Sequence, residues 1–372
     1  MNIGYTNPGY PVVRTILNKC DNVSYTRIRP FSSVLSSIAL KLHLSRLASD
    51  LIFSYFGGLN SRNIDLFHFF NVIPLTCVKK PFITTFETTV PRFLKKGWMY
   101  DNALKSIESN RCKKLLALSE CTKRLQSNLF IELGLEYLSD KIAVLHPPQD
   151  ILTTQGEIES KEVFNKEIVF IFVGRAFWHK GGGEAVRALQ RIRREYPVRL
   201  KIIGNINYRD YMDNPKKDDS NEMHRIIDAN KDWIEYFPSL PNKDVLQIIK
   251  EADIGLLPTR GDTYGYSVLE MQSAGLPCIT TDLRALPEIN NDSCGWLIKI
   301  PKDRNYNAIF QTQDDKDYLC DTIENQLVEI CTSIVNNAAQ MKEKSLKAFQ
   351  RIIAVHDPIV YGEILKEIYQ SV

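Results

Sequence analysis

Uninterrupted apolar runs alternate along this chain with stretches in which apolar residues recur every three or four positions. The run 168–173 is apolar throughout, which is typical of a central parallel strand buried on both faces. The segment 185–192 that follows has apolar residues at helical spacing. Repetition of this order along the chain predicts an α/β fold made of doubly wound parallel sheets.

The same reasoning predicts further elements in both halves of the chain. Apolar runs bounded by turn residues predict strands at 64–70, 80–86, 113–119, 141–145, 200–204, 254–257 and 277–281. Helical spacing predicts helices at 34–51, 243–252, 267–274 and 361–369, and one that starts near residue 122. The charged, apolar-poor stretch 208–221 predicts a surface loop.

Composition and charge extend this picture to two domains. The chain has 372 residues, of which 44% are hydrophobic and 24% are charged, as expected for a globular protein of about two domains. Residues 1–148 carry 19 Lys and Arg against 10 Asp and Glu, whereas the remainder carries 28 against 34. The basic half could face an anionic lipid surface, a phosphorylated acceptor or nucleic acid, or it could be a solvated surface.

Two stretches of the basic half have a composition that suits a membrane surface. The stretch 91–100 interleaves cations with aromatic residues, as in the headgroup region of a bilayer. The segment 34–51 mixes leucines with Lys41, His43 and Arg46, so it could contact a membrane or contribute its leucines to a core. The chain has no nucleic-acid recognition motif, and its pI of about 8.3 is modest. We therefore predict an anionic membrane surface as a partner and no nucleic acid.

Targeting signals and metal-ligand patterns are not apparent in the sequence. No apolar run is long enough to span a bilayer, and the first residues show no signal-peptide pattern. The eight cysteines contain no CxxC pair, which favours reduced thiols, and neither they nor the six histidines have metal-ligand spacing. We expect a cytoplasmic protein that could lie on the inner face of the membrane, without a metal site.

Two carboxylates and a helix N-terminus follow a predicted strand in the second half of the chain. Open α/β sheets bind ligands beyond the carboxyl ends of their strands. Amides near Ser267 and Val268 would face an anion there, and Gly265 would allow its close approach. Asp262 and Glu270 could accept hydrogen bonds from neighbouring hydroxyls. Phosphate and hydroxyls together predict a nucleotide sugar; the alternative is an ordinary βαβ unit with a polar loop.

A second candidate loop follows the apolar run 168–173. It contains Arg175 and Lys180 among glycines, and a predicted helix comes after it. Arg175 can contact two phosphate oxygens with its planar guanidinium, while Lys180 supplies a compact point charge. Strand, cationic glycine loop and helix together predict a phosphate-binding site.

Both loops resemble motifs of the GT-B glycosyltransferases, specifically the retaining family 4. The family's V-G-R-x4-K-G motif resembles residues 173–181, and its P-S-x-x-E-G-F-G-x-x-x-L-E pattern resembles residues 258–270. Two positions differ, because Asp262 replaces a Glu and Thr263 replaces a Gly. The resemblance covers about residues 60–370 and implies an α/β GT-B fold, in which two Rossmann-like domains with parallel sheets face each other across a cleft.

The resemblance implies a role for each residue of these motifs. Arg175 and Lys180 would neutralise the donor diphosphate as it leaves, which makes a metal ion dispensable. Glu270 would hold the ribose hydroxyls, and Asp262 would hold the hydroxyls of the transferring sugar. The remaining residues implied at the nucleotide are Gly174, Phe237, Gly265, Tyr266, Ser267 and Val268.

The first half of the chain resembles the acceptor domain of the same family. Glu87 stands about where the family often has a histidine that lines the reaction centre. It could be an acceptor base, a ligand of sugar hydroxyls or a surface carboxylate.

The resemblance also implies an organisation and a reaction. It implies an acceptor-binding domain at 1–148, a nucleotide-sugar-binding domain at 149–356 and a terminal helix at 357–372 that crosses back to the first domain. The reaction is metal-independent hexosyl transfer with retention, from a nucleotide-diphosphate sugar to a hydroxyl of a glycan or lipid-linked acceptor, in surface polysaccharide synthesis. No cofactor besides this donor substrate is implied. A GT-B sugar-nucleotide epimerase and a non-catalytic GT-B binding subunit are the alternatives.

Overall fold

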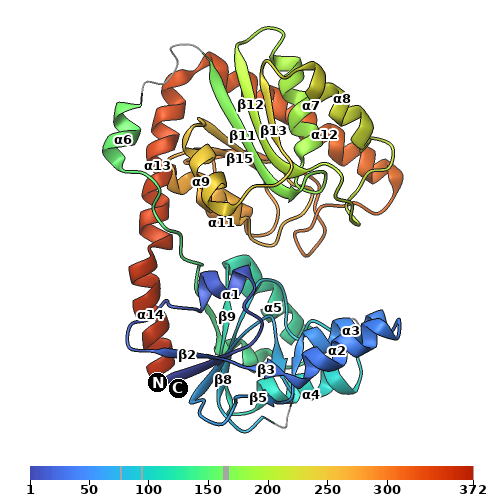
Figure 1. The fold of residues 1–372 in the computed structure, drawn as a ribbon, viewed down its shortest axis with the longest axis vertical. Coiled ribbons are helices and arrows are strands. Elements are labelled where there is room, and N and C mark those ends of the chain that lie inside the picture. Colours follow the sequence, from blue (N-terminus) through green and yellow to red (C-terminus); the bar gives the residue numbers. More distant parts are fainter. Residues whose placement is uncertain (76–77, 94, 162–166, 372) are drawn as a thin grey trace. The chain divides into compact units, whose positions relative to one another are not determined.

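The computed structural model describes residues 1–75, 78–93, 95–161 and 167–371. The predictions that involve Cys77 and Leu94 therefore concern residues outside the described ones. The chain forms two compact units, each built around its own parallel sheet (Figure 1). Unit 1 comprises residues 1–148 and 356–372, and unit 2 comprises residues 149–355.

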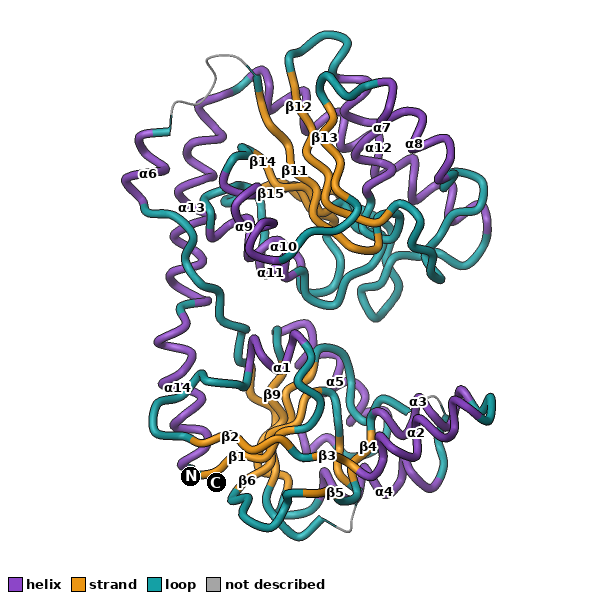
Figure 2. The backbone as a smooth tube through the Cα atoms, in the orientation of Figure 1, coloured by secondary structure: helices purple, strands orange, loops and turns teal. Residues whose placement is uncertain are grey.

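Unit 2 is a doubly wound α/β unit (Figure 2). Its strands are β11 (Ile168–Ala176), β12 (Val198–Asn205), β13 (Ile234–Phe237), β14 (Ile254–Leu257), β15 (Cys278–Thr281) and β16 (Gly295–Ile298). Its helices are α6 (Gln155–Ser160), α7 (Gly182–Ile192), α8 (Ser220–Ala229), α9 (Asn242–Lys250), α10 (Tyr266–Ser273), α11 (Leu286–Ile289), α12 (Gln313–Asn336) and α13 (Ala338–His356), whose last residue is counted with unit 1.

The sheet of unit 2 has the parallel order β13-β12-β11-β14-β15-β16. Helices α7, α8 and α12 cover one face, and α9, α10 and α11 cover the other (Figures 1 and 2). Phe170, Ile171 and Phe172 of β11 are fully buried, as the uninterrupted apolar run predicts. The strand order reverses between β11 and β14, and such a switch point is where open α/β sheets bind ligands.

Unit 1 has a second six-stranded parallel sheet. Its strands are β1 (Asn2–Tyr5), β2 (Ser24–Arg27), β6 (Leu66–Phe70), β8 (Phe82–Phe86), β9 (Cys112–Ala117) and β10 (Ile142–Val144), in the order β10-β9-β8-β6-β1-β2. Short strands form two further pairs, β3 (Arg29–Pro30) with β5 (Gly58–Leu59) and β4 (Ser54–Tyr55) with β7 (Ile73–Pro74). The helices are α1 (Tyr10–Thr15), α2 (Phe31–Lys41), α3 (Ser45–Ile52), α4 (Trp98–Glu108), α5 (Glu120–Glu132), the 3₁₀ helix η1 (Glu136–Lys141) and α14 (Pro358–Gln370).

The terminal helix α14 packs against the sheet of unit 1. Leu365 and Tyr369 share a buried cluster with strand residues such as Ile3 and Leu66. The Tyr369 hydroxyl lies 2.7 Å from Nδ1 of His68, which is itself fully buried in β6. The C-terminal residues therefore complete the core of the unit that the first 148 residues form.

The predicted helix 34–51 is wrong, because two helices cover this segment. His43, between α2 and α3, has a φ of +59°, which interrupts the helical path. The amide of Leu44 then donates to the Ala39 carbonyl at 2.8 Å, and the chain turns back as α3. Within the described ranges, these and the other helices are too short or too polar to cross a membrane.

Candidate active site

The loops after β11 and β14 meet at the switch point of unit 2. The amide of Arg260 donates to the carbonyl of His179 at 2.9 Å, so the two loops are joined through their backbones. Gly181 has a φ of +82°, and a Cβ at this position would lie 2.0 Å from the Pro258 carbonyl oxygen. Only glycine allows so close an approach with this backbone conformation. The structure thus brings the two sequence motifs side by side.

Lys180 and Asp262 form an ion pair that links the two motifs. Nζ of Lys180 lies 2.8 Å from Oδ2 of Asp262 and 2.9 Å from the Gly261 carbonyl oxygen. The Asp262 side chain is only 14% exposed. Burial alone would raise the pKa of Asp262, but the charge of Lys180 and hydrogen bonds from Lys180 and the Tyr264 amide outweigh it and lower that pKa. Asp262 is therefore ionised at neutral pH.

Gly174 and Arg175 lie near the carboxyl end of β11. This strand extends beyond its predicted end at residue 173 to Ala176. A Cβ on Gly174 would lie 2.9 Å from Cβ of Lys180, so the glycine makes room for the lysine stem. Arg175 is exposed, and its Cζ lies 5.6 Å from the centre of the Tyr208 ring, within the range of a cation–π contact. The two predicted phosphate-binding cations therefore differ in environment: Lys180 is held by a carboxylate and Arg175 lies over a ring.

A pocket of about 330 Å³ opens beside Asp262. Arg284 and Asn307 line it, and Nε of Arg284 donates to Oδ1 of Asn307 at 2.6 Å. Carboxylate, guanidinium and amide groups at one pocket can form hydrogen bonds with several hydroxyls of a small ligand.

His179 and Asp210 lie next to this pair, and the sequence reasoning did not single them out. Nδ1 of His179 lies 2.7 Å from Oδ2 of Asp210. Burial and the nearby charge of Lys180 lower the pKa of His179, and the hydrogen bond to Asp210 opposes this only in part. A neutral His179 therefore orients the loop before Lys180 without adding charge to the site. A histidine directly before the motif lysine was the one sequence signal that could have found it.

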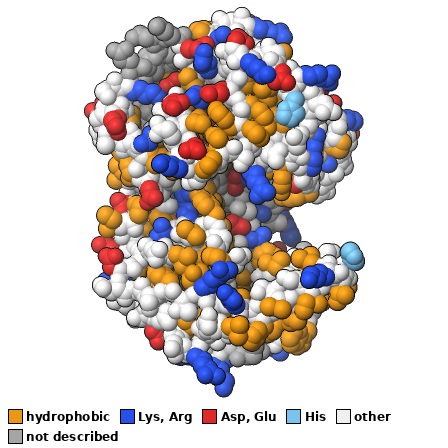
Figure 3. Space-filling model, in the orientation of Figure 1, with side chains coloured by type: hydrophobic (Ala, Val, Ile, Leu, Met, Phe, Trp, Pro, Cys, Tyr) orange, Lys and Arg blue, Asp and Glu red, His pale blue; other side chains and the backbone are white. Residues whose placement is uncertain are grey.

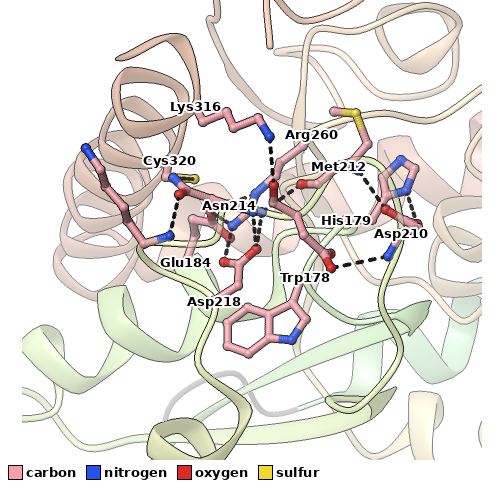
Figure 4. A network of polar contacts seen from close by, with 12 residues as sticks. Trp178, His179, Glu184, Asp210, Met212, Asn214, Asp218, Arg260, Lys316 and Cys320 are labelled. Atoms are coloured by element: carbon pink, nitrogen blue, oxygen red, sulfur yellow. Dashed lines mark hydrogen bonds and ion pairs between the residues drawn. The ribbon is translucent and has the colours of Figure 1, made fainter. Parts of the chain in front are cut away.

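Arg260 is the fully buried centre of an ion network in unit 2 (Figure 4). Its guanidinium donates to Oε1 of Glu184 at 2.6 and 3.0 Å, and to the two carboxylate oxygens of Asp218 at 2.9 and 2.7 Å. A further bond at 3.0 Å goes to the Met212 carbonyl. Burial would lower the pKa of Arg260, but Glu184 and Asp218 raise it, so the side chain is charged. The network fixes the backbone two residues before Asp262.

The predicted surface loop 208–221 is confirmed for its exposed residues, such as Tyr211, but three of its residues are buried. Asn214 is fully buried, Met212 and Asp218 are nearly so, and α8 begins at Ser220. The reason is the buried guanidinium of Arg260, whose charge requires carboxylate and carbonyl partners that this charged segment supplies. Composition indicated a solvated loop because the partner lies about 40 positions away in the sequence.

Helix α10 begins one residue earlier than predicted, at Tyr266. Gly265 precedes it with a φ of +96°, where a side chain would be strained. The amide of Val268 donates to the Gly265 carbonyl at 2.9 Å. An anion at this helix N-terminus would therefore meet the amides of Tyr266 and Ser267, and the expectation of a free amide at Val268 is wrong. Glu270 lies in the second turn and is 8% exposed.

Phe237 is the last residue of β13, at the same carboxyl edge of the sheet. It is partly exposed there. This position is compatible with a contact to a base, and the role stays a prediction.

Glu87 follows β8 in unit 1, where it lines a polar pocket of about 760 Å³ together with Arg27, Arg29 and Asn71. Its Oε1 accepts from Arg92 at 3.1 Å and from Nδ2 of Asn71 at 3.2 Å. The side chain is 20% exposed. Glu87 is therefore a bonded, half-buried carboxylate rather than a solvated one, and its role towards an acceptor stays a prediction.

No group of three His, Cys, Asp or Glu side chains that could hold a metal ion occurs in the part of the chain that the structure describes. The seven cysteines in that part are free thiols and buried.

Known sequences match unit 2 and, in one case, most of the chain. Residues 154–319 match the family model "Glycosyl transferases group 1". A glycogen synthase of Mycobacterium tuberculosis is 29% identical over 119 residues, which are 32% of this chain and 27% of that protein, so the chain spans about a quarter of this relative. An uncharacterized 41.2 kDa protein in the cps region of Klebsiella pneumoniae is 22% identical over 281 residues, 75% of this chain and 72% of that protein.

Solved structures resemble the whole chain. The Anabaena protein HepE, in complex with UDP, has a TM-score of 0.63 at 13% identity and covers 100% of both chains. WaaG, a glycosyltransferase involved in lipopolysaccharide biosynthesis, has a TM-score of 0.57 at 14% identity and covers 97% of this chain and 99% of its own. The predicted GT-B fold is thus confirmed, and the assignment to the retaining family 4 stays a prediction. The chain has a GT-B fold, and its residues 154–319 match the glycosyl transferases group 1.

Proposed function

We propose that this protein is a retaining, metal-independent hexosyltransferase that uses a nucleotide-diphosphate sugar as donor. The observation that carries the proposal is the ion pair of Lys180 with Asp262 at the switch point of unit 2. It joins a cation suited to a diphosphate and a carboxylate suited to sugar hydroxyls at one place. A binding subunit without activity would not need an ionised, nearly buried carboxylate beside its phosphate site.

The proposed residues stabilise the charge of the leaving diphosphate and position the transferring sugar. When the bond between the anomeric carbon and the diphosphate oxygen breaks, the diphosphate gains negative charge. Nζ of Lys180, the guanidinium of Arg175 and the N-terminus of α10 stabilise that charge. Asp262 accepts hydrogen bonds from the transferring sugar, whose hydroxyls enter the adjoining 330 Å³ pocket. The acceptor oxygen bonds to the anomeric carbon on the face that the diphosphate leaves, and the diphosphate takes up its proton.

The nature of the donor is supported by the structural neighbours. HepE from Anabaena is known in complex with UDP and with UDP-glucose. In this proposal Glu270 holds the ribose hydroxyls, and Phe237 lies near the base. The Gly265 and Tyr266 backbone lies closest to the diphosphate.

The relatives and unit 1 support a proposal for the acceptor and for the cellular location. One relative is a protein in a cps region and WaaG is involved in lipopolysaccharide biosynthesis, which supports a role in surface polysaccharide synthesis. The acceptor hydroxyl would bind in the polar pocket that Glu87 lines. The protein would work in the cytoplasm, as a peripheral protein on the inner face of the membrane.

The donor is tested by thermal denaturation with a panel of nucleoside diphosphates and their sugars. A ligand that binds only the folded state at 100 times its Kd adds about 2.7 kcal/mol of stability and raises Tm. Nucleotide release is then measured with and without acceptor in excess EDTA. Acceptor-dependent release in EDTA supports the proposal. Release without any acceptor indicates an epimerase or hydrolase, and activity that requires Mg²⁺ indicates another mechanism of charge stabilisation.

A further inference from the structure

Helices α2, α3 and α4 of unit 1 expose many apolar side chains, which gather at the edge of this unit (Figure 3). Leu42 is 63% exposed and Trp98 is 70% exposed. Between the helices lies a cavity of about 690 Å³, which we name the apolar groove. Its walls include Leu35, Ile38, Leu42, Leu47, Trp98 and Met99. The volume lies within the roughly 300–1,000 Å³ of ligand pockets.

The apolar groove is preformed by packing beneath it. Ala39 of α2 and Ala48 and Leu51 of α3 form a small buried cluster. Oγ of Ser36 donates to the Ala48 carbonyl at 2.9 Å and fixes the spacing of the two helices. The exposed leucines therefore stand on a supported helical pair, and their exposure is a property of the folded unit.

Three cations lie close in sequence to residues that line the apolar groove. Lys41 ends α2, Arg46 lies in the first turn of α3, and Lys95 precedes α4, and all three are exposed. Among the described residues, none of the three forms an ion pair with a carboxylate. A ligand that fills the apolar groove would therefore meet positive charge at its polar end.

Helix α2 separates the apolar groove from the polar pocket of unit 1. Ile38 and Leu42 face the groove, whereas Ser33 and Ser37 line the polar pocket. Leu51 lines both cavities, so their walls adjoin. A hydrocarbon site and a site for polar groups thus lie on two sides of one helix.

We propose that the apolar groove binds the hydrocarbon chain of an anionic, lipid-linked acceptor whose headgroup reaches the polar pocket. This inference rests on the proposed function and narrows its acceptor class. A soluble sugar would lose its hydrogen bonds to water against leucine walls. A second copy docked symmetrically would bring its own Lys41 and Arg46 towards the same cations, and like charges would oppose the contact.

The test uses 11-bromoundecyl phosphate below its micellar concentration, with the full chain. Bromine on the chain quenches tryptophan on contact, and Trp98 is the tryptophan at the groove. We expect saturable quenching in the wild type, its loss in Trp98→Phe, and no competition by inorganic phosphate. Quenching that persists in Trp98→Phe would overturn the assignment of the site.

The double variant Leu42→Gln/Leu47→Gln tests whether the leucine wall of the apolar groove binds the amphiphile. Both residues are exposed, so the fold should persist, and the lost apolar contact should weaken binding by about tenfold or more. The matched control is Ile131→Gln on α5, where an exposed isoleucine lies outside the groove. Equal affinity in both variants would overturn the proposal.

Two further outcomes would also overturn it. Binding to phosphatidylglycerol vesicles without any binding of the monomeric amphiphile would make the apolar groove a membrane-contact face. A dimer that dissociates in the double variant would assign it to a second copy. Nucleoside diphosphate binding, measured by Tm in the same variants, tests the proposed function separately. If the protein binds the amphiphile but no nucleoside diphosphate, the proposed function is rejected. If it binds a nucleoside diphosphate but no amphiphile, only the proposal for the apolar groove is rejected.

Discussion

Unit 2 buries charge at its candidate site, whereas unit 1 exposes hydrocarbon beside its polar pocket. Arg260 is fully buried, and two carboxylates satisfy its guanidinium. Leu42 and Trp98 remain largely exposed. Each arrangement is unfavourable by itself, since desolvated charge requires partners and exposed apolar surface favours burial. The charge finds its partners within the chain, and we infer that the exposed hydrocarbon finds its partner in a ligand.

Residues that hold the candidate site in place also differ from residues that would contact a ligand. Arg260 fixes the backbone of the loop that carries Asp262, and it is a positioning residue. Lys180 and Arg175 are less buried than Arg260, so a ligand can reach their charged groups. Variants at these positions should therefore affect different quantities.

The largest effect is expected for Arg260→Met. The change leaves the buried carboxylates of Glu184 and Asp218 without their cation, which should lower the free energy of unfolding by about 3–5 kcal/mol. Urea denaturation measures it. The control is Lys231→Met, since Lys231 pairs with Asp228 at 2.8 Å in solvent and should change stability by less than about 1 kcal/mol. Similar losses of unfolding free energy in both variants would contradict a larger contribution of the buried ion pairs.

Lys180→Ala and Arg175→Ala should each lower kcat/KM by about 10²–10³-fold, because each removes a charge that stabilises the leaving diphosphate. Thermal denaturation should show a folded protein, since neither side chain is part of the core. Lys243→Ala, an exposed cation at the start of α9, serves as control and should keep wild-type turnover. Wild-type turnover in Lys180→Ala would remove this loop from the diphosphate site.

Asp262→Asn should lower kcat/KM by about 10- to 100-fold, because one acceptor oxygen becomes a donor towards the sugar hydroxyls. Affinity for the bare nucleoside diphosphate should change little, which calorimetry can measure. Asp262→Glu should retain activity and could change the preferred sugar. Unchanged turnover in Asp262→Asn, with loss of nucleotide binding in Glu270→Ala, would exclude Asp262 from sugar recognition.

A smaller effect is expected from His68 in the core of unit 1. Burial lowers the pKa of His68 to about 3, from 6.5. Between these values the unfolded chain binds a proton that the folded chain does not, so stability is fully present above pH 6.5 and declines as pH falls towards 3. The slope is at most about 1.4 kcal/mol per pH unit. His68→Gln should show a shallower decline between pH 6.5 and 5, measured by urea denaturation, and an identical slope would contradict a neutral His68.

Local pattern predicted most of the strands of unit 2 and the residues of its two motifs. The predicted strand 254–257 coincides with β14, because a short apolar run that ends at a proline is specified by its own residues. The spacing of Arg175, Lys180 and Asp262 could also be read from the sequence, since motif spacing is a local property; their roles towards a ligand stay predictions. The strands β1 and β2 were not predicted, because neither is a long apolar run; β1 forms by pairing with β6, and β2 by pairing with β1.

Only the tertiary structure decided which residues surround these motifs. No local pattern indicates that Arg260 is buried, because its partners Glu184 and Asp218 lie 76 and 42 positions away. The same network includes the buried residues Met212 and Asp218 of a segment whose composition is typical of a surface loop. Helix 34–51 was interrupted at His43, and the apolar groove appeared between its two parts. Sequence specifies what each segment can form alone, whereas burial of charge and the shape of a cavity depend on segments that only the fold brings together.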